Sequence, residues 1–435
     1  MGAPSDLQIA QPLTLKCGLT LPNRLVKAAM AEQLAGSGQL PDERLRAIYK
    51  HWAQGGWGMI ITGHIHVDDA YLGAPNDSAL PPSLPPSSLT PPYSALARAS
   101  QGLDQPDSTT TTRRTPTIVQ LNHPGRQSPR GAGTRSFFSP AIAPSAVPLS
   151  LGPGFMPTLA RYLAFGSPRA MTVTEIETVI SQFARAARMC AEAGFDGVEI
   201  HAAHGYLLSQ FLSGKANVRR EEEEGYGGGD ARSRARVLVE VIRAVREEVK
   251  GFEGFCVGVK LNSADHQGEE ALGEWVEQVK AVVEAGVDFV EVSGGTYENP
   301  KMIWGNDGPD GAAQEEKSDR TKAREAFFLE FAQVIRKQFP EVPLMVTGGF
   351  STRAGMEKVV VDGDCDLVGL GRPAVLNPLL PNTVILNPEV KDEDAALYRK
   401  KNKTPWYVKA IGVPAVGAGM DSQWYMNKLH HLAKV

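Results

Sequence analysis

Residues 197–213, GVEIHAAHGYLLSQFLS, join a run of apolar residues to a cluster of polar ones. The run at 197–200 predicts a buried strand, and the residues after Tyr206 predict the start of a helix. His201, His204 and Tyr206 lie where the strand turns into the helix, and all three side chains can donate a proton or a hydrogen bond. Because parallel βα barrels carry their catalytic groups at the carboxyl ends of strands, this stretch predicts both a βα unit and a functional site.

Seven further segments rich in branched apolar residues repeat the strand pattern. Each is apolar at nearly every position, which is typical of parallel strands covered on both faces. Helical patterns separate most of them, at 174–193 with Thr174 as the expected cap and Gly194 at the end, at 270–285 and at 324–339. Eight strands alternating with helices predict an α/β fold, a single (β/α)8 TIM barrel with elaborated βα loops. With 197–203, the predicted strands are 24–30, 58–65, 117–122, 256–262, 288–295, 343–349 and 365–372.

Three segments depart from this alternation. Residues 81–116 are rich in Pro, Ser and Thr and predict an exposed, mobile loop around a short helical piece at 95–101. Residues 137–170, with many prolines and glycines, predict a long loop that folds over the barrel mouth as a lid or substrate wall. The closing residues 419–435 place Trp424, Leu429 and Leu432 on one helical face, which could dock on the barrel or on a partner subunit. We expect residues 1–435 to form one domain.

The composition excludes several classes of partner. The chain has 435 residues, 42% of them hydrophobic, and a formal net charge of −4. Acidic and basic residues are mixed, so we expect neither nucleic acid nor a membrane as partner, and a small molecule becomes the expected ligand. No secretion signal and no span of about 20 apolar residues is present, which favours the cytoplasm. The four cysteines, Cys17, Cys190, Cys256 and Cys365, are far apart in sequence, which argues against an iron–sulfur or structural zinc site and for reduced thiols.

The eight strand ends form a coherent set for a phosphorylated cofactor. Glycines at the carboxyl ends of the seventh and eighth predicted strands let backbone amides approach an anion, and the guanidinium group of Arg372 adds a positive charge. Gln120 can donate and accept at once, as the edge of a pyrimidine-like ring requires, and Lys260 would place a positive charge beside a ring that becomes anionic on reduction. Flavin mononucleotide (FMN) satisfies both. The ends comprise 28–31, Gly63, Gln120, the His201 cluster, Lys260, 293–295, Gly348, Gly349, Gly371 and Arg372.

Five ordered motifs make the chain resemble the Old Yellow Enzyme family of FMN-dependent ene-reductases over essentially its whole length. HAAHGYLLSQFLS, followed by Asn217, Arg219 and 226–228, resembles the central signature of that family. The others are QLNHPGRQ from Gln120, GVKLNSAD from Gly258, VTGGF from Val346 and GLGRP from Gly369.

The resemblance implies a ping-pong cycle in a single FMN-binding domain. NADPH or NADH reduces FMN and leaves, and an α,β-unsaturated carbonyl compound then takes hydride at its β-carbon. His201 and His204 would bind the substrate carbonyl, and Tyr206 would protonate the α-carbon. The cofactor contacts implied are Ala28, Ala29, Met30, Ala31, Gly63, Gln120, His201 and Lys260 for the ring, and Gly348, Gly349, Gly371 and Arg372 for the phosphate.

The chain also departs from some relatives in that family. Ala31 stands where others have a cysteine or threonine beside the flavin, and Gln33 falls where some have a substrate-contacting tyrosine. An acidic insertion occupies 221–224. These changes leave the favoured substrate, the nicotinamide preference and the oligomeric state open.

Simpler interpretations stand beside these roles. The histidine pair could bind a metal, but no third ligand is imposed by the spacing, so no metal is expected. Tyr206 could be a buried aromatic residue, the glycines could serve turn geometry alone, and Lys260 could form a salt bridge inside the barrel, with Glu199 as partner. No catalytic role is assigned to His51, His64, His66, His123 or His266.

Four alternative functions compete with ene-reduction. The same flavin site could isomerise or cyclise a biosynthetic intermediate. An iron–sulfur dienoyl-CoA reductase is disfavoured by the cysteine spacing and by the short tail after the barrel. A barrel without flavin that uses Lys260 as a Schiff-base nucleophile would leave Gln120 and Arg372 without a role. A non-catalytic flavin-binding protein is the fourth alternative.

Overall fold

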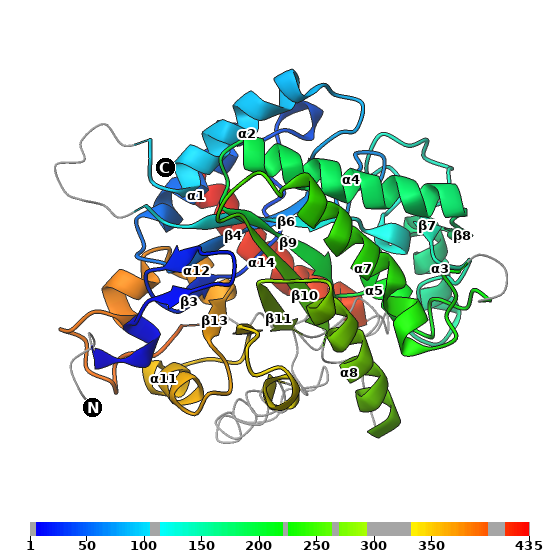
Figure 1. The fold of residues 1–435 in the computed structure, drawn as a ribbon. Coiled ribbons are helices and arrows are strands. Elements are labelled where there is room, and N and C mark those ends of the chain that lie inside the picture. Colours follow the sequence, from blue (N-terminus) through cyan, green and yellow to red (C-terminus); the bar gives the residue numbers. More distant parts are fainter. Residues whose placement is uncertain are drawn as a thin grey trace.

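Eight parallel strands close into a barrel in the computed structural model, which describes residues 6–104, 114–220, 225–262, 269–293, 332–398 and 414–434. Each strand pairs in parallel with the next, and pairing of β13 with β3 and of β3 with β4 closes the ring. The predicted barrel is therefore confirmed, and Figure 1 shows its strands at the centre of the molecule. The strands are β3 (Leu25–Lys27), β4 (Met59–His66), β6 (Thr117–Asn122), β9 (Gly197–Ala202), β10 (Cys256–Asn262), β11 (Phe289–Ser293), β12 (Leu344–Thr347) and β13 (Leu367–Leu370).

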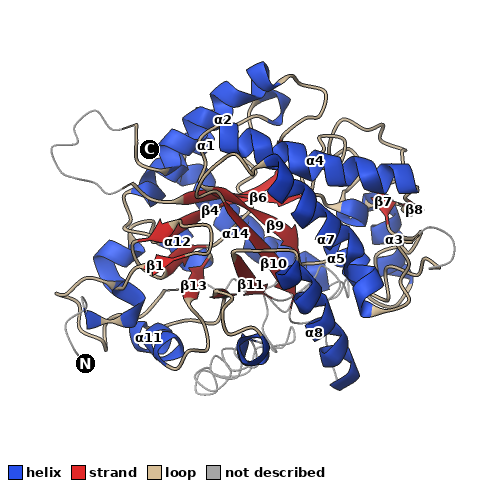
Figure 2. Cartoon of the chain, viewed as in Figure 1, coloured by secondary structure: helices blue, strands red, loops and turns tan. Residues whose placement is uncertain are grey.

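Helices surround the barrel on the outside (Figure 2). The predicted helix at 174–193 is α4, but its cap is Thr172, whose side chain and that of Glu175 form a reciprocal capping box, and not Thr174. The predicted helix at 270–285 is α8; of 324–339, residues 332–338 are helical and 324–331 lie outside the described residues. The helices are α1 (Glu43–Ala53), α2 (Pro86–Ser100), α3 (Phe155–Ala164), α4 (Val173–Glu192), α5 (Leu207–Leu212), α7 (Ala231–Glu248), α8 (Glu269–Glu284), α11 (Arg353–Val361), α12 (Arg372–Leu376) and α14 (Pro414–Leu432).

Within the described residues, none of the helices combines the length and the apolar character needed to cross a membrane. Short strands and single-turn helices complete this part of the chain. The short strands are β1 (Leu13–Thr14), β2 (Thr20–Leu21), β5 (Ser78–Ala79), β7 (Ile142–Ala143) and β8 (Arg169–Ala170), and the single-turn helices are η2 (Gln8–Ala10), η3 (Ser37–Gln39), η4 (Gly125–Gln127) and η5 (Pro381–Ile385).

The barrel interior consists of layers because alternate residues of each strand point inward. The layer near the amino ends of the strands is apolar and includes Val26, Met59, Ile61, Ile118, Phe289, Met345 and Leu367. Two residues further along the strands the layer becomes polar, with Gln120, Glu199, Lys260 and Glu291 all buried. From the mouth inward, the functional groups thus lie above a polar layer of side chains, and the polar layer lies above an apolar one.

Helix α2 spans residues 86–100, so the helical piece predicted at 95–101 is confirmed, whereas the prediction of a loop is wrong for residues 86–94. This helix contains Pro91 and Pro92, which cost backbone hydrogen bonds in a helix interior. Its Leu89 and Tyr93 are nevertheless fully buried against the core. Burial of this apolar face stabilises a helix that the composition disfavours, while residues 105–113 lie outside the described part of the chain.

The predicted loop over 137–170 contains regular structure. Strands β7 and β8 pair in parallel, and α3 lies between them in sequence. Several large apolar side chains of α3 are exposed, including Phe155 and Leu163. A role of this segment as a lid or substrate wall stays a prediction.

The closing helix docks on the barrel of its own chain. Helix α14 packs against α1 and α12. Tyr425 and Leu429 are its buried residues, while Trp424 and Leu432 are half-buried and pack at the edge of the same core. Its His430 Nε2 lies 2.9 Å from the carbonyl oxygen of Glu32, so α14 is tied to the loop after β3 at the barrel mouth.

Candidate active site

The turn between β9 and α5 brings His201, His204 and Tyr206 together. The His201 ring lies 5.0 Å from the His204 ring and 4.9 Å from the Tyr206 ring, measured between centroids, and both contacts are edge to face. All three residues are buried. His204 adopts a φ of 58°, a left-handed backbone that residues other than glycine rarely take. Such strain is typical of functional sites, where it aims a side chain that regular geometry would misdirect.

Hydrogen bonds determine where the two histidines carry their protons. His201 Nδ1 accepts the Ala203 N–H at 3.2 Å, so its proton belongs on Nε2, which lies 3.2 Å from His204 Nδ1. His204 then carries its proton on Nε2, 3.2 Å from Ser293 Oγ. Burial, reinforced by the charge of nearby Lys260, lowers the pKa of both histidines well below the ordinary value. Both histidines are therefore neutral at pH 7. The N–H that is not used between the two rings belongs to His204 Nε2, and it is the donor of the pair toward other groups.

Four buried polar residues from neighbouring strands form the layer under this pair. Gln120 Nε2 donates to Glu199 Oε1 at 2.7 Å, and Lys260 Nζ lies 2.7 Å from Glu291 Oε1. Burial and the charge of Glu291 raise the pKa of Glu199 well above its ordinary value. For Glu291, burial raises the pKa, but the charge of Lys260 and the hydrogen bonds to Glu291 together outweigh burial and lower the pKa. Glu199 is therefore neutral, and the one charged pair is Lys260 with Glu291.

This layer corrects one sequence interpretation and adds residues that the sequence analysis missed. A salt bridge of Lys260 inside the barrel exists, but its partner is Glu291 on β11 and not Glu199. Ser293 was recognised only as a strand end, and its bond to His204 was not foreseen. Strand register could have suggested both, since residues two apart on β11 point to the same side.

The ends of β12 and β13 present backbone where the sequence predicts a phosphate site. Gly348 and Gly349 have φ values of 103° and 92°, left-handed conformations that favour glycine. At Gly371 a Cβ would come within 3.3 Å of Met30 Sδ, so the ends of β13 and β3 approach closely. The Arg372 guanidinium lies 5.7 Å from the Tyr425 ring centroid, which places α14 beside this corner. Of the predicted strand end 293–295, residues 294 and 295 lie outside the described residues.

The ends of β3, β4 and β6 supply the surroundings expected of a flavin ring. Residues 29–31 are partly exposed at the mouth, whereas Ala28 is buried. Asn122, fully buried at the end of β6, has no hydrogen-bond partner for either side-chain polar atom among the described residues. A buried amide without partner is costly unless a ligand completes it. The amide of Asn122 without a partner and the polar layer fit the ring of FMN, and the pair of glycines with positive φ fits its phosphate.

The model of the NADH:flavin oxidoreductase / NADH oxidase family matches residues 114–389. The chain belongs to this family. It is 47% identical over 418 residues to the NADH-dependent flavin oxidoreductase iliE of Hypocrea jecorina (strain QM6a), a match that covers 96% of this chain and 99% of that protein. The resemblance to the Old Yellow Enzyme family is thereby confirmed, and FMN is the cofactor.

Two further comparisons agree with this assignment. The NADH-dependent flavin oxidoreductase iliE of Neonectria sp. (strain DH2) is 48% identical over 438 residues; the match covers 99% of this chain and 55% of that protein, so the chain spans about half the length of this relative. Among solved structures, morphinone reductase superimposes with a TM-score of 0.66 at 22% identity, covering 92% of this chain and 93% of that one. The latter likeness concerns the fold alone.

Gly63 differs from the other predicted flavin contacts, because its N–H is already bonded within the chain. It donates to Glu32 Oε1 at 2.8 Å and to the Tyr49 hydroxyl at 2.9 Å. A Cβ at this position would lie 1.9 Å from Glu32 Oε2 and 2.3 Å from the Met30 carbonyl oxygen. The immediate role of Gly63 is thus to let β4 approach the chain after β3, which carries the expected flavin contacts 28–31.

We expect Gly63→Ala to lower the free energy of unfolding by about 1–3 kcal/mol, as overpacking does. The displaced Met30 should also weaken FMN binding, measured as release of yellow colour on dilution and dialysis. Gly251→Ala is the matched control, because a Cβ there meets nothing within 4 Å. FMN retention and stability equal to the wild type in Gly63→Ala would contradict this role.

A second group of histidines lies beside the first, where the sequence analysis assigned no role. His64 Nε2 and His66 Nε2 lie 3.3 and 3.1 Å from Asp77 Oδ2, and the His64 ring contacts the Tyr206 ring edge to face, 5.7 Å between centroids. The spacing His64-x-His66 at a strand end was visible in the sequence. The contribution of Asp77, from the loop before β5, was not.

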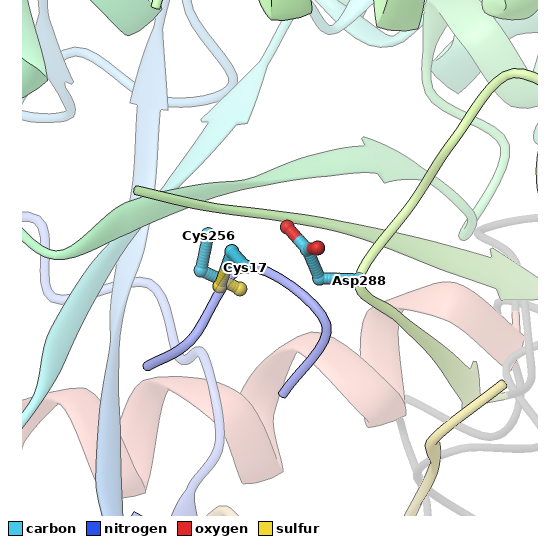
Figure 3. A group of neighbouring side chains, drawn as sticks. All are labelled: Cys17, Cys256 and Asp288. Atoms are coloured by element: carbon cyan, nitrogen blue, oxygen red, sulfur yellow. The ribbon is translucent and has the colours of Figure 1, made fainter. Parts of the chain in front are cut away.

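The cysteines, far apart in sequence, include one close pair in space. Figure 3 shows the thiols of Cys17 and Cys256 side by side, with Asp288 next to them. Asp288 Oδ2 accepts the Val257 N–H at 2.7 Å and pairs with Arg246 at 2.7 Å, so its charge is already compensated. Cys256 opens β10 and Asp288 directly precedes β11, which places the group at the amino ends of the strands, opposite the active site.

Proposed function

We propose that this chain reduces the activated C=C bond of α,β-unsaturated carbonyl compounds, with NADH as the electron source. The observation that carries the proposal is that one turn places a neutral imidazole donor, His204, and a phenol, Tyr206, against the same His201 ring. Bound FMN supplies the hydride. The names of both fungal relatives, NADH-dependent flavin oxidoreductases, favour NADH over NADPH.

The residues take complementary roles in this proposal. His204 would donate its Nε2–H, which faces Ser293 Oγ in the structure, to the substrate carbonyl oxygen, and His201 orients His204 through the bond to Nδ1. Because neither histidine is charged, the carbonyl oxygen gains a hydrogen bond without a proton, and negative charge that develops there is stabilised. Tyr206 holds the proton that the α-carbon receives.

The cofactor contacts in this proposal surround the mouth. Gln120 and Lys260 of the polar layer, with the backbone at 28–31 and Gly63, would hold the ring. The glycines that follow β12 and β13, with Arg372, would hold the phosphate. These assignments are Ala28, Ala29, Met30, Ala31, Gly63, Gln120, His201 and Lys260 toward the ring and Gly348, Gly349, Gly371 and Arg372 toward the phosphate.

The purified protein tests the proposal directly. It should be yellow, bleach with NADH in the absence of oxygen, and recover its colour when cyclohexenone is added, with cyclohexanone as product. A colourless preparation that cannot be reconstituted with FMN would refute it. If NADH bleaches the protein but no enone restores its colour, ene-reduction is refuted, and isomerisation or cyclisation at the same flavin is favoured.

A further inference from the structure

An irregularity in β4 places His64 at the barrel mouth. The pairing of β4 with β6 shifts register between Ile61 and His64, after which His64 faces Gln120. The His64 ring then lies edge to face against the Tyr206 ring, at 5.7 Å between centroids and 80° between planes. Both residues are nearly buried, so little water separates them.

Asp77 anchors His64 from the opposite side. Its Oδ2 lies 3.3 Å from His64 Nε2 and also accepts the Ala74 N–H at 2.8 Å. The carboxylate is 3% exposed, and the strand pairing of β5 with β4 begins at the next residue, Ser78. Asp77 is therefore a rigid, buried anion whose nearest side-chain partners are two histidines.

The charges around His64 decide which histidine is protonated. Burial alone would lower the pKa of His64, but the charge and hydrogen bond of Asp77, together with Glu32, outweigh it, and Lys260 opposes them; the pKa is raised overall. Burial lowers the pKa of His66, which shares Asp77. His64 thus carries the positive charge of this group, and its field reaches His201 and His204 as well.

We propose that His64 is a positioning residue for Tyr206: Asp77 holds it as a cation against the phenol ring, where its charge favours departure of the Tyr206 proton. This inference rests on the proposed function. In the step it assists, the Tyr206 O–H bond breaks, a C–H bond forms at the substrate α-carbon, and the phenolate is left beside the His64 cation. Water later returns the proton to Tyr206, while His64 stays protonated throughout.

The His64 and Tyr206 ring centroids lie 5.7 Å apart, and a unit charge at about this separation favours a phenolate by roughly one to two powers of ten at the effective dielectric constant of a protein interior. We therefore expect His64→Asn to slow enone-driven recolouring at pH 6.5 by roughly ten- to hundred-fold. Bleaching by NADH, which needs no proton from Tyr206, should change little. His431→Asn, an exposed histidine on α14, is the control and should change neither rate.

The pH profile separates this role from a structural one. A histidine with raised pKa is a cation below that pKa and loses its charge above it, so recolouring by the wild type should slow as the pH rises through that pKa, which lies above 6.5. His64→Asn should lack this decrease in rate with rising pH, and in Asp77→Asn the decrease should occur at lower pH. Recolouring by His64→Asn at the wild-type rate with an unchanged profile would overturn the inference. A wild type that no enone recolours would instead refute the proposed function.

A measurement on the resting protein completes the test without turnover. Histidine ring resonances of labelled protein, with His64 assigned by its loss in His64→Asn, should give a His64 pKa above 6.5 that falls in Asp77→Asn. A pKa below 6.5 in the wild type would overturn the inference. So would one equivalent of bound metal that His64→Asn removes, because the metal would then occupy the nitrogen that must hold the proton.

Discussion

Replacing Tyr206 with phenylalanine is expected to slow enone-driven recolouring by roughly 10²- to 10⁴-fold, the usual contribution of a positioned proton donor. Bleaching by NADH and the FMN content should remain close to the wild type. The reason is local: phenylalanine keeps the ring that contacts His64 and His201 and removes only the hydroxyl. Anaerobic stopped-flow spectroscopy measures the two half-reactions separately.

Two further observations decide the interpretation of this result. Tyr398→Phe, at a tyrosine that is 68% exposed, is the matched control and should leave both half-reactions unchanged. If Tyr206→Phe recolours as fast as the wild type, the proton comes from another donor and the assignment of Tyr206 is wrong. If both half-reactions slow equally, Tyr206 serves the structure of the site and not the proton.

Replacing Glu291 with glutamine should lower the free energy of unfolding by about 3–5 kcal/mol, the cost of breaking a buried ion pair. Lys260 is 3% exposed, and its Nζ lies 2.7 Å from Glu291 Oε1, so the substitution leaves a buried cation without its counter-ion. Urea denaturation at pH 7 measures the effect. FMN must be saturating throughout, because bound ligand adds to stability. A loss below 1 kcal/mol would show that Lys260 is neutralised in another way.

Glu199→Gln is the matched control on the neighbouring strand. The raised pKa of Glu199 means that the folded protein holds a proton there which the unfolded chain releases above the ordinary pKa of 4.5. Its contribution to stability is therefore complete below pH 4.5 and is lost as the pH rises. Glutamine imitates the protonated acid and does not titrate, so the variant should be at least as stable as the wild type at pH 7. If Glu199→Gln destabilises the protein as much as Glu291→Gln does, the assignment of Glu199 as the neutral carboxyl group is wrong.

The barrel was predictable because parallel strands covered on both faces must be apolar at nearly every position. Seven of the eight predicted segments contain the observed strand, β4 ends one residue beyond its predicted segment, and α4 lies within a residue of its predicted bounds. The prediction failed for residues 86–94 of α2, because local composition with Pro91 and Pro92 argues for a loop, whereas burial of Leu89 and Tyr93 favours a helix. Tertiary burial outweighs local preference where the two conflict.

The candidate site was predictable only in part. His201, His204 and Tyr206 come from one turn, so their proximity follows from the chain itself. Glu291, Ser293 and Asp77 reach the site from other strands and loops. Their pairings depend on which strands are neighbours in the barrel, on the register between those strands and on the irregularity in β4.

By itself, the sequence determined the alternation of strands and helices, the direction of each strand and thus the end at which the functional groups gather. These properties are local, because they depend on the periodicity of apolar residues and on which residue follows each strand. Only the tertiary structure decided which groups are charged: that Lys260 pairs with Glu291, that Glu199 stays neutral, and that His64 is the protonated member of its pair. Protonation depends on burial and on charges a few ångströms away, and both exist only after distant strands have closed the barrel.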